Sequence, residues 1–170
     1  LHMVGPGANQ AYSYLWPMPD ADHAPGFWQD MAPRFAGNPL VIYELYNEPW
    51  PDGNQNSSAA WTCWEDGSGC GLSYTPVGMQ SLIDTVRGTG ATNLILADGI
   101  QYANRIGAWS LSDPLNNTAA AWHIYPYNPC ADATCWGNEL TALRAGANVP
   151  VLVTEFGEES CGSSFIEPLM

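Results

Sequence analysis

The sequence predicts an α/β fold, an incomplete (β/α)₈ barrel in which parallel strands alternate with helices. Four apolar runs are spread along the 170 residues, and each is continuous, as expected for parallel strands covered on both faces. Segments with helical periodicity lie between them, which favours right-handed βαβ units. The glycine-rich string GPGANQ lacks the third glycine of a dinucleotide-binding turn, so the barrel is preferred to a doubly wound open sheet.

The first predicted elements are a helix and a strand. The helix, 27–35, has apolar residues at every fourth position, and Pro33 should bend it or end it early. The strand, 40–46, is continuous and apolar and ends in the polar string NEP. This strand is therefore expected to pass through the core and to emerge at a polar edge.

The clearest helix is predicted over 75–87. Thr75 is expected to be its N-cap and Pro76 its first residue, a buried face recurs every three or four residues, and Gly88 should stop it. The second strand, 93–97, follows.

The last predicted elements are a third strand at 119–125, a shorter helix at 139–145 and a fourth strand at 149–156. The chain opens LHMVGPG, without an initiator Met, and breaks off at FIEPLM, where an apolar helical pattern begins. We therefore expect residues 1–170 to form one partial domain that is truncated at both ends.

Composition limits the class of partner. Four Lys plus Arg oppose 17 Asp plus Glu, and the formal charge of −13 argues against binding to nucleic acid or to an anionic membrane surface. No apolar run approaches the roughly twenty residues of a membrane span. Eight Trp and eight Tyr, many in Gly- and Pro-rich segments, suit stacking on sugar rings, although each one singly is an ordinary core candidate.

The five cysteines predict local disulfides. Cys63 and Cys70 are close in sequence, as are Cys130 and Cys135, and no CxxC pair suggests zinc. Loop-closing disulfides in an exported protein are favoured over reduced thiols. Cys161 competes for Cys130 or Cys135, so the pairing of these three stays open.

Three predicted strands end in polar strings: YNEP at 46–49, WHIYPYN at 122–128 and TEFGE at 154–158. In a barrel these carboxyl ends share one rim, where active sites are built. Glu48 and Glu155 are then expected to face each other. Two such carboxylates can cleave a glycosidic bond, one protonating the leaving oxygen and the other attacking the anomeric carbon, and the charge of one raises the pKa of the other.

The strings VIYELYNEP, AAAWHIYPYN and VLVTEFGE, in this order and spacing, resemble glycoside hydrolase family five, the cellulase family of retaining TIM-barrel enzymes. NEP and TEFG are specific together, whereas NEP alone is shared with related barrel glycosidases. The resemblance covers nearly the whole chain, from the end of the third barrel strand to the start of the seventh helix. It implies a partial catalytic domain of a secreted, extracellular enzyme that is monomeric when complete, uses no cofactor or metal, and acts on β-linked polysaccharide or oligosaccharide.

The resemblance also implies roles for single residues. Glu48 matches the acid/base and Glu155 the nucleophile, and Asn47 matches the amide that hydrogen-bonds the sugar 2-OH. His123 and Tyr125 match a pair on the sixth strand, with the Tyr hydroxyl oriented toward the nucleophile.

The remaining candidates are a histidine and three aromatic residues. His2 matches the histidine that ends the third strand of the family. The candidate sugar-binding residues are Trp50, Trp122 and Tyr127. Packing of the loop is the alternative for Trp50, and a core histidine beside Trp122 is the alternative for His123.

The predicted function is a retaining, endo-acting hydrolase of β-1,4-linked polysaccharide, cellulose or a related β-glucan. A β-mannanase or other hemicellulase of the family, and a non-catalytic carbohydrate-binding barrel fragment, are the alternatives. A metal-dependent hydrolase is disfavoured because no HExxH string or cluster of His ligands occurs. The family's Arg on the second strand and its aromatic residue on the eighth are absent, since those strands are not in this sequence.

Overall fold

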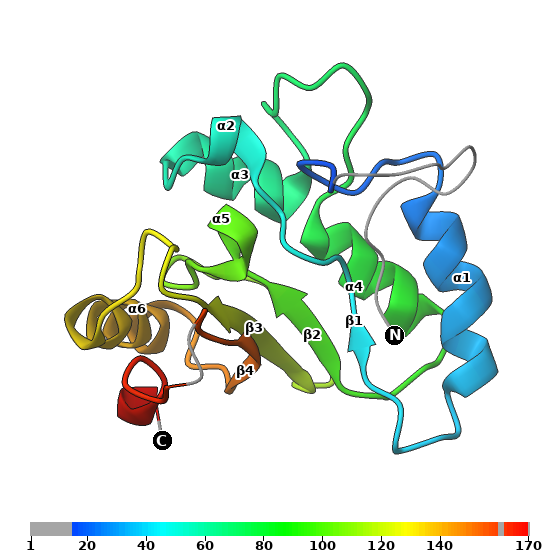
Figure 1. Cartoon of the computed structure of the whole chain (residues 1–170). Coiled ribbons are helices and arrows are strands. Elements are labelled where there is room, and N and C mark those ends of the chain that lie inside the picture. The colour runs from blue at the N-terminus through cyan, green and yellow to red at the C-terminus, as the bar shows by residue number, and fades with distance from the viewer. Residues whose placement is uncertain (1–14, 160–161, 170) are drawn as a thin grey trace.

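The computed structural model of the protein describes residues 15–159 and 162–169. Four parallel strands form one curled sheet in which each strand pairs with the next along the chain (Figure 1). The strands are β1 (Tyr43–Glu44), β2 (Ile95–Asp98), β3 (Thr118–Ile124) and β4 (Val151–Phe156). Sequential order without a switch point is the arrangement of a barrel wall, so the prediction of an incomplete (β/α)₈ barrel is confirmed.

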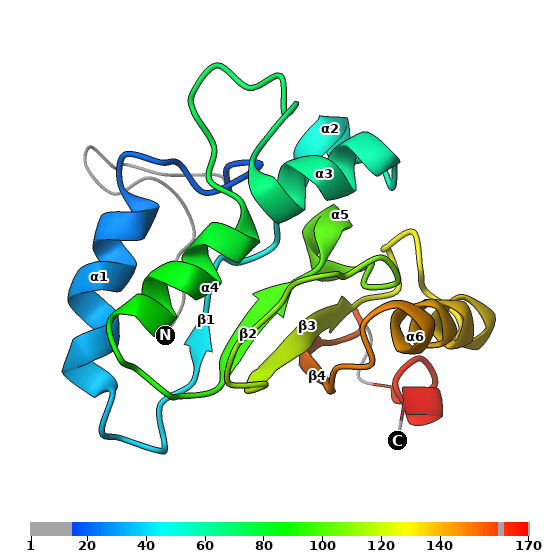
Figure 2. The same ribbon diagram turned by 180° about the vertical axis from the view of Figure 1, so that it is seen from behind.

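Helices lie before, between and after the strands. They are α1 (Ala24–Phe35), α2 (Pro51–Asn54), α3 (Ser58–Asp66), α4 (Met79–Gly88), α5 (Ile100–Ala103), α6 (Ala133–Gly146) and the 3₁₀ helix η1 (Glu167–Leu169). Figure 2 shows α1 and α4 together at the β1 end of the sheet and α6 at the β4 end. The short α2 and α5 follow the carboxyl ends of β1 and β2, where they line the expected rim.

The predicted start of the helix over 75–87 is wrong for a physical reason. α4 begins at Met79 with Gly78 as N-cap, and not at Thr75. The segment before it is extended because Pro76 forms an antiparallel bridge with Asp20, which removes Thr75 and Pro76 from the helix. At the other end the helix stops at Gly88, as predicted.

The first helix is also longer than predicted. α1 starts at Ala24, with Pro25 in its first turn, and continues through Pro33 to Phe35. α6 likewise starts before the predicted 139–145, because the side chain of Asp132 caps it by accepting a hydrogen bond from the Cys135 N–H at 2.9 Å.

The core lies between the sheet and the helices, and three buried tryptophans tie the layers together. The indole N–H groups of Trp28, Trp64 and Trp109 donate to backbone carbonyls at or near strand ends, those of Leu45, Asp98 and Ala97. All three rings are almost fully buried. The ends of β1 and β2 are therefore held by both packing and hydrogen bonds.

Two of the expected local disulfides are present. Cys63–Cys70 closes the loop after α3, and Cys130–Cys135 closes the loop between β3 and α6. Cys161 lies outside the described residues. Among the described residues, no helix is both long and apolar enough to cross a membrane.

Candidate active site

The structure brings the three polar strand ends to one edge of the sheet. β1, β3 and β4 are parallel members of one sheet, so Glu48, His123 and Glu155 arrive from the same direction. One oxygen of each carboxylate and one nitrogen of the imidazole all lie within 4.8 Å of one another. Residues 75 and 32 positions apart are thereby joined in one site.

His123 lies between the two carboxylates. Its Nδ1 is 2.9 Å from Oε1 of Glu48 and 3.5 Å from Oε2 of Glu155. The imidazole is fully buried, whereas Glu48 and Glu155 keep a quarter to two fifths of their side chains exposed. A fully buried ring next to two partly exposed carboxylates orients them while leaving them open to a ligand.

Tyr125 holds one oxygen of Glu155. Its hydroxyl donates to Oε2 at 3.0 Å, and its ring stacks on that of Tyr127 with centroids 5.3 Å apart. Burial, together with the hydrogen bond to Glu155 and the charge of that carboxylate, raises the pKa of Tyr125 to about 12. The phenol therefore stays protonated near neutral pH and remains a donor to Glu155.

Asn47 precedes Glu48 in the segment that follows β1. Its Oδ1 is buried and has no hydrogen-bond partner among the described residues. Buried amide oxygens are nearly always paired in folded proteins, so this atom is poised to accept a donor from a ligand.

Beside Glu48 lies a cavity of about 330 Å³. Its lining residues are Glu48, Asn54, Tyr102, Tyr125, Tyr127, Asn128 and Pro129. The exposed rings of Tyr102 and Tyr127 give the cavity aromatic surface. Trp50 is half-buried beside Tyr102, with ring centroids 6.1 Å apart, and its indole N–H donates to the carbonyl of Leu15. Trp50 thus packs within the loop, and its binding of a sugar stays a prediction.

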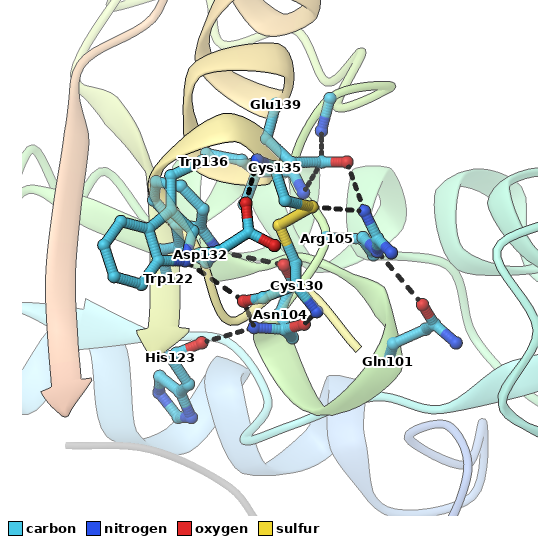
Figure 3. The surroundings of a disulfide bond; sticks show 12 residues. Gln101, Asn104, Arg105, Trp122, His123, Cys130, Asp132, Cys135, Trp136 and Glu139 are labelled. Carbon is cyan, nitrogen blue, oxygen red and sulfur yellow. Dashed lines mark hydrogen bonds and ion pairs between the residues drawn. A yellow bond between two sulfur atoms is a disulfide. The ribbon is translucent and has the colours of Figure 1, made fainter. Parts of the chain in front are cut away.

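The prediction that Trp122 binds substrate is corrected. Alternation along β3 turns His123 toward the carboxylates and Trp122 to the opposite, helix-covered side. The ring is 3% exposed, and its Nε1 donates to the backbone carbonyl of Asn104 at 2.9 Å. Figure 3 shows it beside Trp136, away from the imidazole of His123. A ring buried in this way offers no face to a sugar.

Asn104 is a structural residue that the sequence analysis missed. Its buried amide donates to the carbonyls of His123 and Cys130 and accepts from the N–H of Cys130 (Figure 3). The loop closed by the Cys130–Cys135 disulfide is thus bound to the strand that carries His123. No motif marks this Asn, because its role depends on contacts distant in sequence.

Asp98 is a second residue that was missed. It ends β2, is fully buried, and its Oδ2 accepts the backbone N–H of Glu48 at 2.8 Å. The signal was available, because LILAD ends an apolar strand in an acid just as VIYELYNE does. Burial, followed by the nearby charge of Glu44, raises the pKa of Asp98 well above its ordinary value.

The site also holds two sets of possible metal-binding atoms among the described residues: Glu44 with Asp98 and His123, and Glu48 with His123 and Glu155. The imidazole belongs to both sets, and its Nδ1 already contacts Glu48. We assign no metal to either set, and the expectation that the chemistry needs none stays a prediction. His2, the remaining candidate, lies outside the described residues.

Comparisons with known proteins give a consistent result. The family model Cellulase (glycosyl hydrolase family 5) matches residues 8–167. Endoglucanase 1 of Robillarda sp. (strain Y-20) is 27% identical over 158 residues, which cover 77% of this chain and 34% of that protein. Endoglucanase Z of Dickeya dadantii (strain 3937) is 24% identical over 155 residues, which cover 88% of this chain and 32% of that protein. The chain therefore spans about a third of the length of these relatives.

Among solved structures, the catalytic domain of a mannanase from Streptomyces sp. SirexAA-E superposes with a TM-score of 0.61 at 23% identity. The match covers 92% of this chain and 45% of that one. At this identity the similarity shows a shared barrel fold, with the present chain corresponding to part of it.

Proposed function

The chain belongs to glycosyl hydrolase family 5, and on this premise we propose that the protein is a retaining, endo-acting hydrolase of β-1,4-linked glucan. The observation that carries the proposal is the separation of the two carboxylates. An oxygen of Glu48 and an oxygen of Glu155 lie within 4.8 Å. Retaining glycosidases hold their carboxyl groups about 5 to 5.5 Å apart, and inverting ones about 6.5 to 9.5 Å, to make room for a water.

In the proposed first step, Glu155 attacks the anomeric carbon while Glu48 protonates the leaving oxygen. The glycosidic bond breaks, a glycosyl ester forms on Glu155, and the shortened chain leaves as an alcohol. Tyr125 supports this step, because donation to Oε2 holds the nucleophile in place and leaves its other oxygen to attack.

In the second step, Glu48 removes a proton from water, whose oxygen attacks the anomeric carbon and displaces Glu155. Glu48 is again a carboxylic acid, Glu155 is again a carboxylate, and the new sugar hydroxyl has the original configuration. His123 supports both steps, since its Nδ1 lies 2.9 Å from Glu48 and 3.5 Å from Glu155 and can stabilise either one when it carries charge.

Substrate choice rests on the surroundings of the carboxylates. The formal charge of −13 suits a neutral polysaccharide, and Tyr127 offers an exposed ring face for a sugar. The unpaired Oδ1 of Asn47 is proposed to accept the 2-OH of the sugar. Both curated relatives are endoglucanases, which favours glucan over mannan.

The proposal also covers the location and the oligomeric state of the protein. The disulfides Cys63–Cys70 and Cys130–Cys135 favour an oxidising compartment, and we propose an extracellular location. We propose that the protein acts as a monomer.

The decisive experiment follows the hydrolysis of a soluble β-1,4-glucan by proton NMR, with reducing-end release measured in parallel. A β-configured new reducing end, before mutarotation, is expected from double displacement. An α-configured product would show an inverting mechanism and overturn the assignment of Glu155. Binding of the glucan without hydrolysis would replace the proposal with a carbohydrate-binding function. Repeating the assay in a chelator should leave the rate unchanged, because no step uses a metal.

A further inference from the structure

We infer that Asp98 is a positioning residue for Glu48, fixing both its backbone and, through His123, its carboxyl group in the orientation that proton donation requires. The inference rests on the proposed function, since it presumes that Glu48 is the acid/base. It assigns a role to a residue outside the three strand-end motifs that predicted the site.

The first contact of Asp98 is with the backbone of Glu48. Glu48 has φ = +53°, in the left-handed region, and it precedes Pro49. A residue before proline favours extended backbone, and a left-handed residue other than glycine costs about 1–3 kcal/mol unless its surroundings hold it. The Glu48 N–H donates to Oδ2 of Asp98 at 2.8 Å, so the buried acid stabilises this unusual conformation.

The second contact of Asp98 is indirect, through His123, with the side chain of Glu48. Oδ2 of Asp98 lies 3.8 Å from Nε2 of His123, and Nδ1 of the same ring lies 2.9 Å from Oε1 of Glu48. Asp98, the imidazole and Glu48 therefore form a closed ring of contacts. A group that faces Nε2 influences which ring nitrogen carries the proton, and hence whether Nδ1 can donate to Glu48.

Asp98 is itself firmly held. Its backbone carbonyl accepts the indole N–H of Trp64 at 2.7 Å. The next residue is Gly99, where a Cβ would come within 1.8 Å of the carbonyl oxygen of Arg105, so the turn is too tight for any side chain. The turn then bonds back to the motif, since the N–H of Tyr102 donates to the carbonyl of Pro49.

The neighbouring carboxylates of Glu44 and Glu48 favour the neutral form of Asp98. Glu44 on β1, Glu48 after β1 and His123 on β3 face it, and Glu155 lies on the far side of the imidazole. Burial and the charge of Glu44 are the largest causes of its raised pKa. A neutral acid can hold the Glu48 N–H without adding a further negative charge beside Glu44, Glu48 and Glu155.

This protonation state makes Asn the matched substitution. Its carbonyl oxygen can accept the Glu48 N–H, and its NH₂ replaces the acid O–H. Asp98→Ala removes both functions, so the comparison of Asp98→Asn with Asp98→Ala isolates the contribution of the hydrogen bonds of Asp98.

The test compares kcat/KM for dinitrophenyl and phenyl β-cellobiosides, which differ in whether the leaving group must be protonated. Dinitrophenolate departs without protonation, whereas phenolate needs the acid. Asp98→Ala should lower kcat/KM for the phenyl substrate about 100-fold or more, the scale of general acid catalysis, and for the dinitrophenyl substrate by less than about 3-fold. Asp98→Asn should stay within about 3-fold of the unchanged protein on both substrates.

Equal losses on both substrates by a folded Asp98→Ala protein would show a structural effect only and overturn the inference, as would no loss on either. If Asp98→Ala does not fold, Asp98→Leu takes its place, because it removes the same hydrogen bonds but fills the space of the side chain. A selective loss on the phenyl substrate in Asp98→Leu, absent in Asp98→Asn, supports the inference, and equal losses or no loss overturn it. No hydrolysis of either substrate by the unchanged protein would overturn the proposed function, and this inference with it.

Discussion

His123 and Glu155 are direct neighbours across β3 and β4, although an unbroken register would place Thr154 opposite His123. Trp122 pairs with Val153, and the register then shifts so that His123 pairs with Glu155. Such a bulge turns side chains to the other face of a strand. Here it lets the imidazole and the Glu155 carboxylate face the same side, 3.5 Å apart.

The proposed role of Glu155 predicts chemical rescue. Glu155→Ala should abolish hydrolysis, because no group remains to form the glycosyl ester. Azide should restore turnover by attacking the anomeric carbon from the side that the carboxylate occupied, and so give an α-glycosyl azide. NMR of the glycosyl azide formed from an aryl β-cellobioside determines its configuration. Glu48→Ala is the matched control, since the ester still forms there and azide should yield the β-glycosyl azide. Normal hydrolysis by Glu155→Ala would exclude it as the nucleophile.

Loss of the Tyr125 hydroxyl is expected to lower kcat more than it changes KM. Tyr125→Phe keeps the ring stacked on Tyr127 but removes the donor to Oε2 of Glu155. Loss of one positioned donor to a reacting group costs about 10²-fold or more in kcat. Steady-state kinetics on a soluble glucan test this, with Tyr127→Phe as the control, because it keeps the same stacked pair. A rise in KM at unchanged kcat would instead make Tyr125 a binding residue only.

The cavity beside Glu48 predicts a different kinetic signature. Tyr102→Ala removes an aromatic wall of this cavity. We expect the departing sugar to lie there, because Glu48, which protonates the leaving oxygen, also lines the cavity. Stacking of this kind contributes about 0.5–1.5 kcal/mol, so KM for cello-oligosaccharides should rise about 2- to 10-fold, with kcat nearly unchanged. Tyr102→Phe should behave like the unchanged protein. An unaltered KM in Tyr102→Ala would show that sugar does not occupy this cavity.

The parts of the site that could be predicted are those set by local pattern. Parallel strands present their carboxyl ends at one rim, so YNEP and TEFG indicated that Glu48 and Glu155 meet there. The burial of Trp122 was not predicted, because the neighbouring residues Trp122 and His123 point to opposite faces of the strand and only one of them can face the site. The start of α4 was missed because pairing of Pro76 with Asp20 is tertiary.

The role of Asp98 could not be predicted from the sequence. An acid at the end of a strand is visible in the sequence, but its meaning depends on the left-handed backbone of Glu48, for which neither Glu nor a following proline gives a signal. The same holds for Gln101 and Tyr102 in α5, which have positive φ without being glycine. Contacts between loops impose these conformations, and local propensity does not encode them.

The last prediction concerns stability, at a site remote from the carboxylates. Arg87 and Asp113 form a buried ion pair at 2.8 Å, with 6% and 3% of their side chains exposed. Burial alone would raise the pKa of Asp113, but hydrogen bonds from Arg87, Thr118 and backbone N–H groups outweigh it and lower the pKa far below its ordinary value. The ionised carboxyl therefore stabilises the fold above the pKa of an unfolded Asp, about 3.9. This contribution is lost as the pH falls from there through the folded pKa.

Asp113→Asn should consequently lower the free energy of unfolding by about 3 kcal/mol at neutral pH, because it leaves the Arg87 charge buried without its partner. The deficit should shrink when denaturant unfolding is repeated toward pH 3, where the unchanged protein begins to lose the same interaction. Asp30→Asn is the matched control. Asp30 and Arg34 are 2.7 Å apart but 61% exposed, and such a surface pair contributes less than about 1 kcal/mol. Equal effects of the two substitutions would show that burial of the Arg87–Asp113 pair does not determine its contribution, and a deficit independent of pH would show that the charge of Asp113 is not its source.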